Sequence, residues 1–200
     1  MNVYECCPQV SNEKYIIRLV QETDCADLLK VYSDKRAVPL FNSDNCHGDN
    51  FHYCTEERMM RGIHMWMNSY KAGSFVRWSI VDKKKGCAIG TIEMFRRKAK
   101  DEYNDCIILR LDLCSDYEAE EEIEAILALI VPPSFYWFNC VRMATKAKAI
   151  ARERIEVLRR MGFEWSSEKL VGHDGTEYGD YYVLSAIRSG TFVGGEVNKR

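Results

Sequence analysis

The sequence predicts an α+β domain with a mixed, mostly antiparallel central sheet of about seven strands and helices on both faces. The chain has 200 residues, which suits a single domain, and no stretch in its middle has the composition of a linker. Apolar residues make up 46% of the chain, enough to bury a core and too many for a disordered protein. Strand segments are joined first by tight turns and later by helices, which indicates both antiparallel and parallel neighbours in one sheet.

The first third of the chain contains one strand and two helices. Residues 15–20 have the character of a strand, and Thr23 or Asp24 can cap the helix that follows. Thr55 is the expected start of a second helix, whose Met and aromatic residues recur at a spacing of three to four and indicate a core-facing side. Gly73 is expected to end this helix.

The remaining elements alternate between strands and helices. The turn at residues 83–86 joins two strands into a hairpin. The strand at residues 107–113 leads into an apolar helix, which Pro132 and Pro133 are expected to end after Val131. The predicted strands are residues 15–20, 75–81, 87–95, 107–113, 140–145, 163–170 and 181–187.

We expect one domain over residues 15–188, preceded by an N-terminal extension at residues 1–14. Residues 189–200 contain several glycines and are expected to form a loosely held tail.

Charge and cysteine content narrow the classes of function. The chain carries 28 Lys and Arg against 30 Asp and Glu, which argues against a general nucleic-acid binder, because such proteins need a basic surface. No apolar run is long enough to cross a bilayer, and residues 1–9 lack the pattern of a signal peptide. The nine cysteines are odd in number and include no C-x-x-C pair, so we expect reduced thiols. We therefore predict a cytoplasmic protein without a membrane or nucleic-acid partner, and a homodimer is compatible with the sequence.

A strong signal lies where the apolar strand at residues 107–113 runs into a helix that begins with acids. Such a junction often holds a phosphate, because free backbone N–H groups and the helix dipole favour an anion there. Here residues 116–124 carry six carboxylates, which would repel a phosphate. Two interpretations stay open: the acids stabilise the helix start and pair with neighbouring cations, or the junction retains a ligand. The cations expected nearby are Arg142, Lys146, Lys148 and Arg152.

The long polar and aromatic segment at residues 35–54 is a second signal, because loops of this length inside compact domains are often functional. Its Asp44, Asp49, His52 and Tyr53 suit the binding of a cationic amine by carboxylates and aromatic faces. The alternative is an ordered loop whose aromatic side chains fill the core and whose Asp and Asn residues form turns. Its cysteines and histidines do not have the spacing of a common zinc site, so no metal is predicted.

Four segments resemble those of a known family. They are residues 16–19 (Ile-Ile-Arg-Leu), 78–81 (Trp-Ser-Ile-Val), 89–93 (Ile-Gly-Thr-Ile-Glu) and 154–163, the last being a helix that ends in Gly-Phe. Together with the order of elements over residues 15–187, they make the chain resemble the GCN5-related N-acetyltransferase (GNAT) family. The similarity is greatest to its branch of ribosomal-protein alanine acetyltransferases.

The resemblance implies that acetyl-CoA is the co-substrate and lies between the strand at residues 107–113 and the strand at residues 140–145. It implies that the pantetheine arm pairs with the first strand, while the pyrophosphate lies on the N-terminus of the following helix. Cationic side chains beyond the second strand offer the phosphates an alternative place. The cofactor-binding residues expected on this basis are Leu111, Leu113, Ala119, Glu121, Glu122, Lys146, Lys148 and Arg152.

The chain departs from the family pattern in two places. Ala119 and Glu121 stand where the family has glycines in its phosphate-binding turn, so Cβ atoms and charge obstruct a phosphate. In the last helix, Ala151, Arg154 and Leu158 stand where the family often has an Asn and a hydroxyl group near the cofactor thiol.

The function implied by the resemblance is transfer of an acetyl group from acetyl-CoA to the primary amine of a small molecule or peptide. The backbone of residues 111–113 is expected to bind the carbonyl oxygen, and Asp112 and Glu93 are the expected bases. The segment at residues 35–54 occupies the place that lines the family's acceptor site. The alternative is a non-catalytic small-molecule or protein-binding module on an acetyltransferase scaffold, which the lost glycines and the missing hydroxyl group favour.

Overall fold

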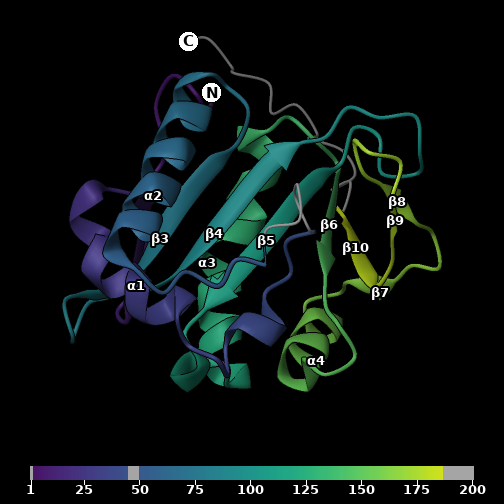
Figure 1. The fold of residues 1–200 in the computed structure, drawn as a ribbon. Coiled ribbons are helices and arrows are strands. Elements are labelled where there is room, and N and C mark those ends of the chain that lie inside the picture. Colours follow the sequence, from purple (N-terminus) through teal and green to yellow (C-terminus); the bar gives the residue numbers. More distant parts are fainter. Residues whose placement is uncertain (1, 45–49, 187–200) are drawn as a thin grey trace, which may run out of the picture.

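The main sheet runs through the centre of the molecule, with helices packed on both of its faces (Figure 1). The computed structural model describes residues 2–44 and 50–186. Within these residues the main sheet has eight strands in the order β1-β2-β3-β4-β5-β6-β10-β7, and β8 and β9 form a separate pair. The strands are β1 (Val10–Ser11), β2 (Tyr15–Leu19), β3 (Val76–Asp82), β4 (Cys87–Arg96), β5 (Ile107–Leu113), β6 (Arg142–Lys146), β7 (Glu164–Trp165), β8 (Leu170–Val171), β9 (Glu177–Tyr178) and β10 (Tyr181–Ser185).

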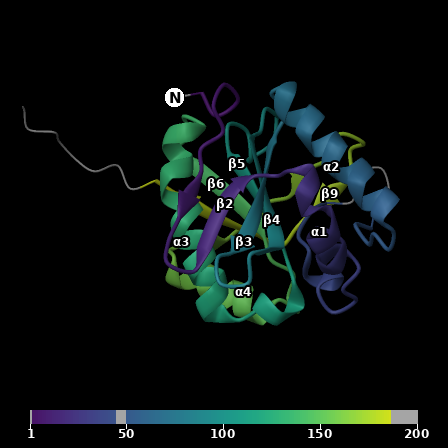
Figure 2. The same ribbon diagram turned by 90° about the vertical axis from the view of Figure 1, so that its left-hand side faces the viewer.

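The α-helices divide between the two faces of the sheet: α1 and α2 cover one face, and α3 covers the other (Figure 2). Thr55 begins α2 as predicted, because its hydroxyl accepts a hydrogen bond from the backbone N–H of Arg58 (3.2 Å). Gly73 follows the end of α2 with φ of +70°, a conformation that favours glycine. The helices are α1 (Cys25–Tyr32), α2 (Glu56–Lys71), α3 (Glu120–Trp137) and α4 (Arg152–Arg160), with short 3-10 turns η1 (Glu22–Asp24), η2 (Val38–Leu40) and η4 (Ser115–Tyr117).

The predicted fold class is confirmed, and β-strand parity explains how one sheet serves two cores. Leu109 and Leu111 of β5 face α3 in the larger core, where Ile123 and Ile126 of α3 are fully buried. Alternate residues point to the other face, which packs against α1 and α2 through a second core.

Helix α3 corrects one prediction, because it continues through Pro132 and Pro133 to Trp137. Each proline removes a backbone hydrogen bond, at a typical cost of about 3 kcal/mol. The side of the helix that carries Ser134 and Trp137 is nevertheless buried, and the Ser134 hydroxyl donates to the carbonyl of Ile130 (2.5 Å). Burial of this last turn and the extra hydrogen bond offset the loss.

The structure describes the N-terminal segment of the chain but not residues 187–200. The segment expected as an N-terminal extension packs onto the domain: Val3 is buried in the larger core, and β1 pairs with β2 at the sheet edge. The predicted strand at residues 163–170 is limited to the short strands β7 and β8. The tail at residues 189–200 lies outside the described residues.

The feature that positions the site is the parallel pairing of β5 with β6, which ends early. Three residue pairs are in register, and the last is Leu109 with Thr145. Residues 110–113 of β5 continue to pair with β4, but they have no partner on β6. The two strands therefore diverge, and we call the gap between residues 110–113 and Lys146 the splay.

Candidate functional site

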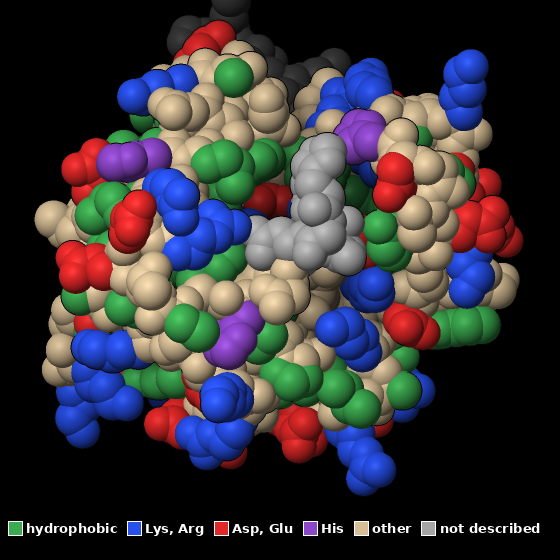
Figure 3. Space-filling model, viewed as in Figure 1, with side chains coloured by type: hydrophobic (Ala, Val, Ile, Leu, Met, Phe, Trp, Pro, Cys, Tyr) green, Lys and Arg blue, Asp and Glu red, His purple; other side chains and the backbone are tan. Residues whose placement is uncertain are grey.

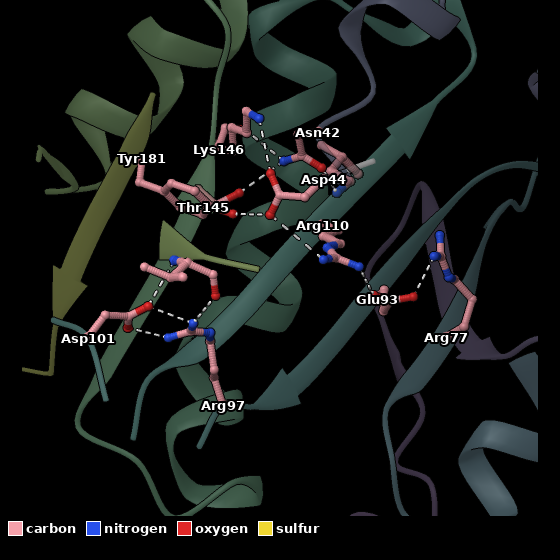
Figure 4. Close-up of polar contacts among 12 residues, drawn as sticks. Asn42, Asp44, Arg77, Glu93, Arg97, Asp101, Arg110, Thr145, Lys146 and Tyr181 are labelled. Carbon is pink, nitrogen blue, oxygen red and sulfur yellow. Dashed lines mark hydrogen bonds and ion pairs between the residues drawn. The ribbon is translucent and has the colours of Figure 1, made fainter. Parts of the chain in front are cut away.

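The amide of Asn42 lies in the splay and connects its two sides (Figure 4). Its oxygen accepts a hydrogen bond from the backbone N–H of Leu111 (2.7 Å). Its nitrogen donates to the hydroxyl of Thr145 (3.1 Å) and to the carbonyl of Lys146 (2.8 Å). Asn42 is buried, so these bonds satisfy groups that have little access to water.

Arg154 of α4 occupies the other part of the splay. Its guanidinium donates to the carbonyl of Leu111 (2.8 Å) and forms a two-point ion pair with Glu118, with Nε 2.9 Å from one carboxylate oxygen. Both backbone polar groups of Leu111 are thus used by side chains of the same chain. The cavity left between these residues has a volume of about 10 Å³, room for one water at most and far too little for a thioester.

The acids at the start of α3 are largely neutralised within the chain, as the first interpretation predicted. A hydrogen bond from Tyr15, in addition to the charge of Lys14, lowers the pKa of Glu122. Glu121 is exposed and has no ion-pair partner among the residues that the structure describes. The ion pairs are Arg36–Asp116, Arg154–Glu118, Arg160–Glu120, Lys14–Glu122 and Arg160–Glu124.

The cations that neutralise these acids are not the predicted ones. Lys146 pairs with Asp44, and Arg142 lies 3.7 Å from Glu102. Lys148 donates to the carbonyl of Pro39 (3.0 Å). Arg152 is exposed and forms no ion pair with another described residue. The prediction was wrong because it took the cations from residues 142–152, the segment that follows α3, whereas the partners come from the N-terminal segment, the residues after α1 and the part of α4 beyond Arg152.

Asp44 lies beyond the splay, between β6 and β10. Its carboxylate accepts hydrogen bonds from Lys146 Nζ (3.0 Å) and from the hydroxyl of Tyr181 (2.5 Å), and it lies 3.9 Å from the guanidinium of Arg110. Burial, followed by the charge of Asp44, raises the pKa of Tyr181. The phenol therefore stays protonated and acts as a hydrogen-bond donor.

A chain of buried charges continues from Arg110 across the sheet. Arg110 donates to Glu93 (2.8 Å), and Arg77 lies between Glu93 (2.5 Å) and Asp112 (3.0 Å). Tyr32 of α1 donates to Asp112 (2.7 Å). Burial alone would raise the pKa of Glu93, but the charges and hydrogen bonds of Arg77 and Arg110 outweigh it and lower that pKa.

A cavity of about 590 Å³ opens on the same side of the sheet, next to Asp44. We call it the basic cavity. The face drawn in Figure 3 is hollowed near its centre, with Lys and Arg side chains on several sides. Its basic lining residues are Arg96, Arg97, Lys98, Lys100 and Arg110, and its apolar walls include Phe95, Leu170, Val171 and Tyr178.

Ion pairs and hydrogen bonds hold the two walls of the basic cavity together. Arg97 and Asp101 of the β4–β5 connection form a two-point ion pair. Both also bind β8, since Arg97 donates to the carbonyl of Val171 (2.6 Å) and the N–H of Val171 donates to Asp101 (2.9 Å) (Figure 4).

The predicted acceptor residues do not gather in one place. Asp44 lines the basic cavity. Tyr53 is buried in the second core, stacked on Tyr32 with ring centroids 5.3 Å apart, as the core-filling interpretation expected. His52 lies beside the thiol of Cys54 (3.3 Å) and not on the cavity lining, and Asp49 lies outside the described residues.

The predicted bases and the predicted cofactor-binding residues also lie in different parts of the structure. Glu93 and Asp112 are buried in the charge chain and do not line the basic cavity. Leu111 faces the splay, whereas Leu113 is fully buried in the larger core. Ala119 directly precedes α3.

Sequence reasoning did not single out Asn42, Arg110 or Tyr181. For Arg110 a signal was present, because a charged residue that interrupts an apolar strand needs a buried partner. Asn42 lies inside the long segment that was singled out, but nothing in the sequence distinguishes it from the other polar residues there.

This chain is similar to known proteins in structure rather than in sequence. No family model matches the sequence, and no curated protein matches it at a significant level. Solved structures do match. An acetyltransferase of the GNAT family from Bacillus anthracis covers 89% of this chain and 98% of its own, with a TM-score of 0.65 and 13% identity. The fold is that of the GNAT acetyltransferases.

Two further matches to the GNAT fold carry more specific names. Ribosomal-protein-S5-alanine acetyltransferase from Vibrio fischeri is 16% identical, with a TM-score of 0.66 over 92% of this chain and 98% of its own. RimJ of Mycobacterium smegmatis, solved with CoA-disulfide, is 12% identical, with a TM-score of 0.68 over 92% of this chain and 90% of its own.

The described ranges, 2–44 and 50–186, contain neither a metal-binding cluster nor a membrane-spanning helix. No group of three or more metal-ligating side chains occurs there. None of the helices in these ranges has both the length and the apolar character needed to cross a bilayer.

Proposed function

We propose that this protein transfers an acetyl group from acetyl-CoA to a primary amine, with the thioester in the splay and the acceptor in the basic cavity. The observation that carries the proposal is the early end of the β5–β6 pairing, inside a sheet that has the GNAT fold. The bonds made by Asn42 support it. A side-chain amide already bonds the backbone of Leu111, as an amide of the pantetheine arm would.

The residues present fit acetyl-CoA only in part. Leu111 offers a backbone N–H and C=O along the splay. The N–H groups of Ala119, Glu120 and Glu121 have no acceptor among the described residues and suit a phosphate. The acidic side chains around them and the Glu118–Arg154 pair oppose it. Binding therefore requires Asn42 and Arg154 to leave the splay.

Acetyl-CoA would supply the thioester carbonyl that a neutral amine attacks. The N–H of Leu111 is a donor placed for the carbonyl oxygen once Asn42 has moved. Asp44 lines the basic cavity and is ion-paired to Lys146 at the edge of the splay, so its carboxylate can hold the incoming amine in place of the lysine. Glu93 and Asp112 remain the predicted bases, and the lowered pKa of Glu93 makes it a weak one.

The second candidate is a non-catalytic binding module, and a specific observation favours it. The splay is filled by Asn42 and Arg154, whose bonds satisfy the backbone of Leu111 without any ligand. In that case the basic cavity would bind its ligand with no chemistry following.

Calorimetric titration with acetyl-CoA distinguishes the two candidates. The acetyltransferase proposal expects saturable binding that CoA competes for, and release of free thiol when an acceptor amine is added. Absence of binding at about 1 mM acetyl-CoA, which corresponds to a binding free energy weaker than about −4 kcal/mol, supports the binding module instead. The cytoplasmic location and the homodimer stay predictions.

A further inference from the structure

The basic cavity differs in charge from the acceptor site that the sequence suggested. The sequence predicted carboxylates and aromatic faces around a cationic amine, with Asp44, Asp49, His52 and Tyr53 as the contacts. In the structure five Lys and Arg side chains line the cavity, against the three carboxylates of Asp44, Asp101 and Asp174. Asp44 and Asp101 are already ion-paired to Lys146 and Arg97.

The rim of the cavity carries cations that remain available. Lys100 is exposed and forms no ion pair with any residue in the described part of the chain. The Lys98 side chain is 75% exposed and shares Asp105 with Arg96, so one carboxylate serves two cations. The rim therefore has excess positive charge directed at solvent and at anything that enters the cavity.

Arg110 lines the cavity, and one N–H of its guanidinium has no partner among the described residues. Arg110 is mostly buried, with its side chain 19% exposed, and one terminal nitrogen bonds Glu93. Its Nε–H is buried without an acceptor among the residues described. An unpaired guanidinium N–H in such a place is costly, and a carboxylate oxygen is the acceptor that suits it best.

The apolar walls of the cavity are formed by Phe95, Leu170, Val171 and Tyr178. A ligand that fills this space needs an apolar body. Asp44 also lines the cavity, and its ion pair with Lys146 connects the cavity to the splay, where an amine would meet the thioester.

We propose that the basic cavity binds an amine acceptor that carries a carboxylate on an apolar body, as an apolar amino acid or the end of a short peptide does. The carboxylate lies against Arg110 and the rim lysines, the body lies between Phe95 and Leu170, and the amine is directed to Asp44. The direction of the amine rests on the proposed acetyl transfer, whereas the carboxylate and apolar contacts do not.

A matched set of small probes tests the inference without acetyl-CoA. The probes are phenylalanine, phenylpropionate, which lacks the amine, and phenethylamine, which lacks the carboxylate. Titration calorimetry on the full chain is expected to show that phenylpropionate binds at least about tenfold more tightly than phenethylamine, since the carboxylate meets a partly buried guanidinium. Tighter binding of phenethylamine, or no binding of either acid at about 10 mM, overturns the inference.

Two pairs of substitutions locate the binding. Lys98→Glu with Lys100→Glu is expected to weaken phenylpropionate binding by about tenfold, with little effect on folding because both side chains are exposed. Lys71→Glu with Lys84→Glu makes the same change in net charge at exposed positions away from the cavity, and is expected to leave the affinity unchanged. Equal weakening by both pairs would mean a nonspecific charge effect and would overturn the site.

A third arm identifies the source of the carboxylate and separates this inference from the proposed function. Phenylalanine and the dipeptide Phe-Ala place the carboxylate at different distances from the amine, so the tighter one shows whether a free amino acid or a peptide fits. If the titration with acetyl-CoA shows no binding while phenylpropionate still binds, the acetyl transfer is refuted and the carboxylate site remains supported. The reverse result refutes only the site.

Discussion

Replacing Asn42 with Ala should make acetyl-CoA bind more tightly while making the protein less stable. The Asn42 side chain makes three hydrogen bonds, to the backbone of Leu111, the hydroxyl of Thr145 and the carbonyl of Lys146. A ligand that enters the splay must break them. At about 0.5–1.5 kcal/mol each, their loss subtracts about 2–4 kcal/mol from the binding free energy of acetyl-CoA.

The variant removes this competition before the ligand arrives. Since a factor of ten in affinity corresponds to about 1.4 kcal/mol, the loss of about 2–4 kcal/mol means that Asn42→Ala should bind acetyl-CoA about 30- to 700-fold more tightly than the native chain. The same substitution leaves the N–H of Leu111 without its acceptor, so the free energy of unfolding should fall by about 1–3 kcal/mol. Affinity and stability therefore move in opposite directions.

Titration calorimetry with acetyl-CoA and urea unfolding measure the two effects. Ser43→Ala is the matched control: it is next in the chain, and its buried hydroxyl has no hydrogen-bond partner among the described residues. The control should change neither quantity by more than about 0.5 kcal/mol. If Asn42→Ala binds acetyl-CoA no better than the native chain, Asn42 does not compete with the ligand and this reasoning is wrong.

Three further predictions concern stability. Gly90→Ala should lower the free energy of unfolding by about 1–3 kcal/mol in urea, because its Cβ would lie 2.4 Å from the backbone carbonyl of Asp112; an unchanged midpoint would show that the strands can separate. Arg77→Met should cost about 3–5 kcal/mol, since Glu93 and Asp112 would be left buried without their cation, and retention of native stability would contradict the ion-pair geometry. Arg77 and Arg110 lower the pKa of Glu93 in the folded protein despite its burial. The ionised carboxylate therefore stabilises the fold above the unfolded pKa of about 4.3, and this stabilisation is lost as pH falls through the folded pKa. Between about pH 5 and pH 3, the thermal unfolding temperature of Glu93→Gln should therefore fall less than that of the native chain.

The sequence was a good guide wherever local pattern decides the structure. The apolar strand at residues 107–113 was predicted with its observed bounds, because alternation and flanking polar residues are local properties. The Thr55 cap was predicted for the same reason. The error at Pro132 and Pro133 arose because the pattern shows the local cost of a proline but not the burial of the turn beyond it.

The acids at the start of α3 show the limit of such reasoning. Their presence and the conflict with a phosphate are evident from the sequence, and so is the interpretation that they are neutralised internally. The cations that pair with these acids are not evident from the sequence. Lys14 and Arg36 precede Glu122 and Asp116 by 80 residues or more and come from separate elements. Ion pairing between exposed side chains depends on chain approach, which composition does not report.

Sequence alone determines the order of strands and helices, the residues that face each core and the resemblance to an acetyltransferase fold, because hydrophobic period and turn chemistry act over a few residues. The tertiary structure decides what fills the gap between β5 and β6. Asn42 reaches Leu111 across 69 residues of sequence, and Arg154 reaches it across 43 from the other side. An unpaired backbone group in a buried gap must find a donor or acceptor, and which side chain supplies it depends on the elements that the folded chain brings together.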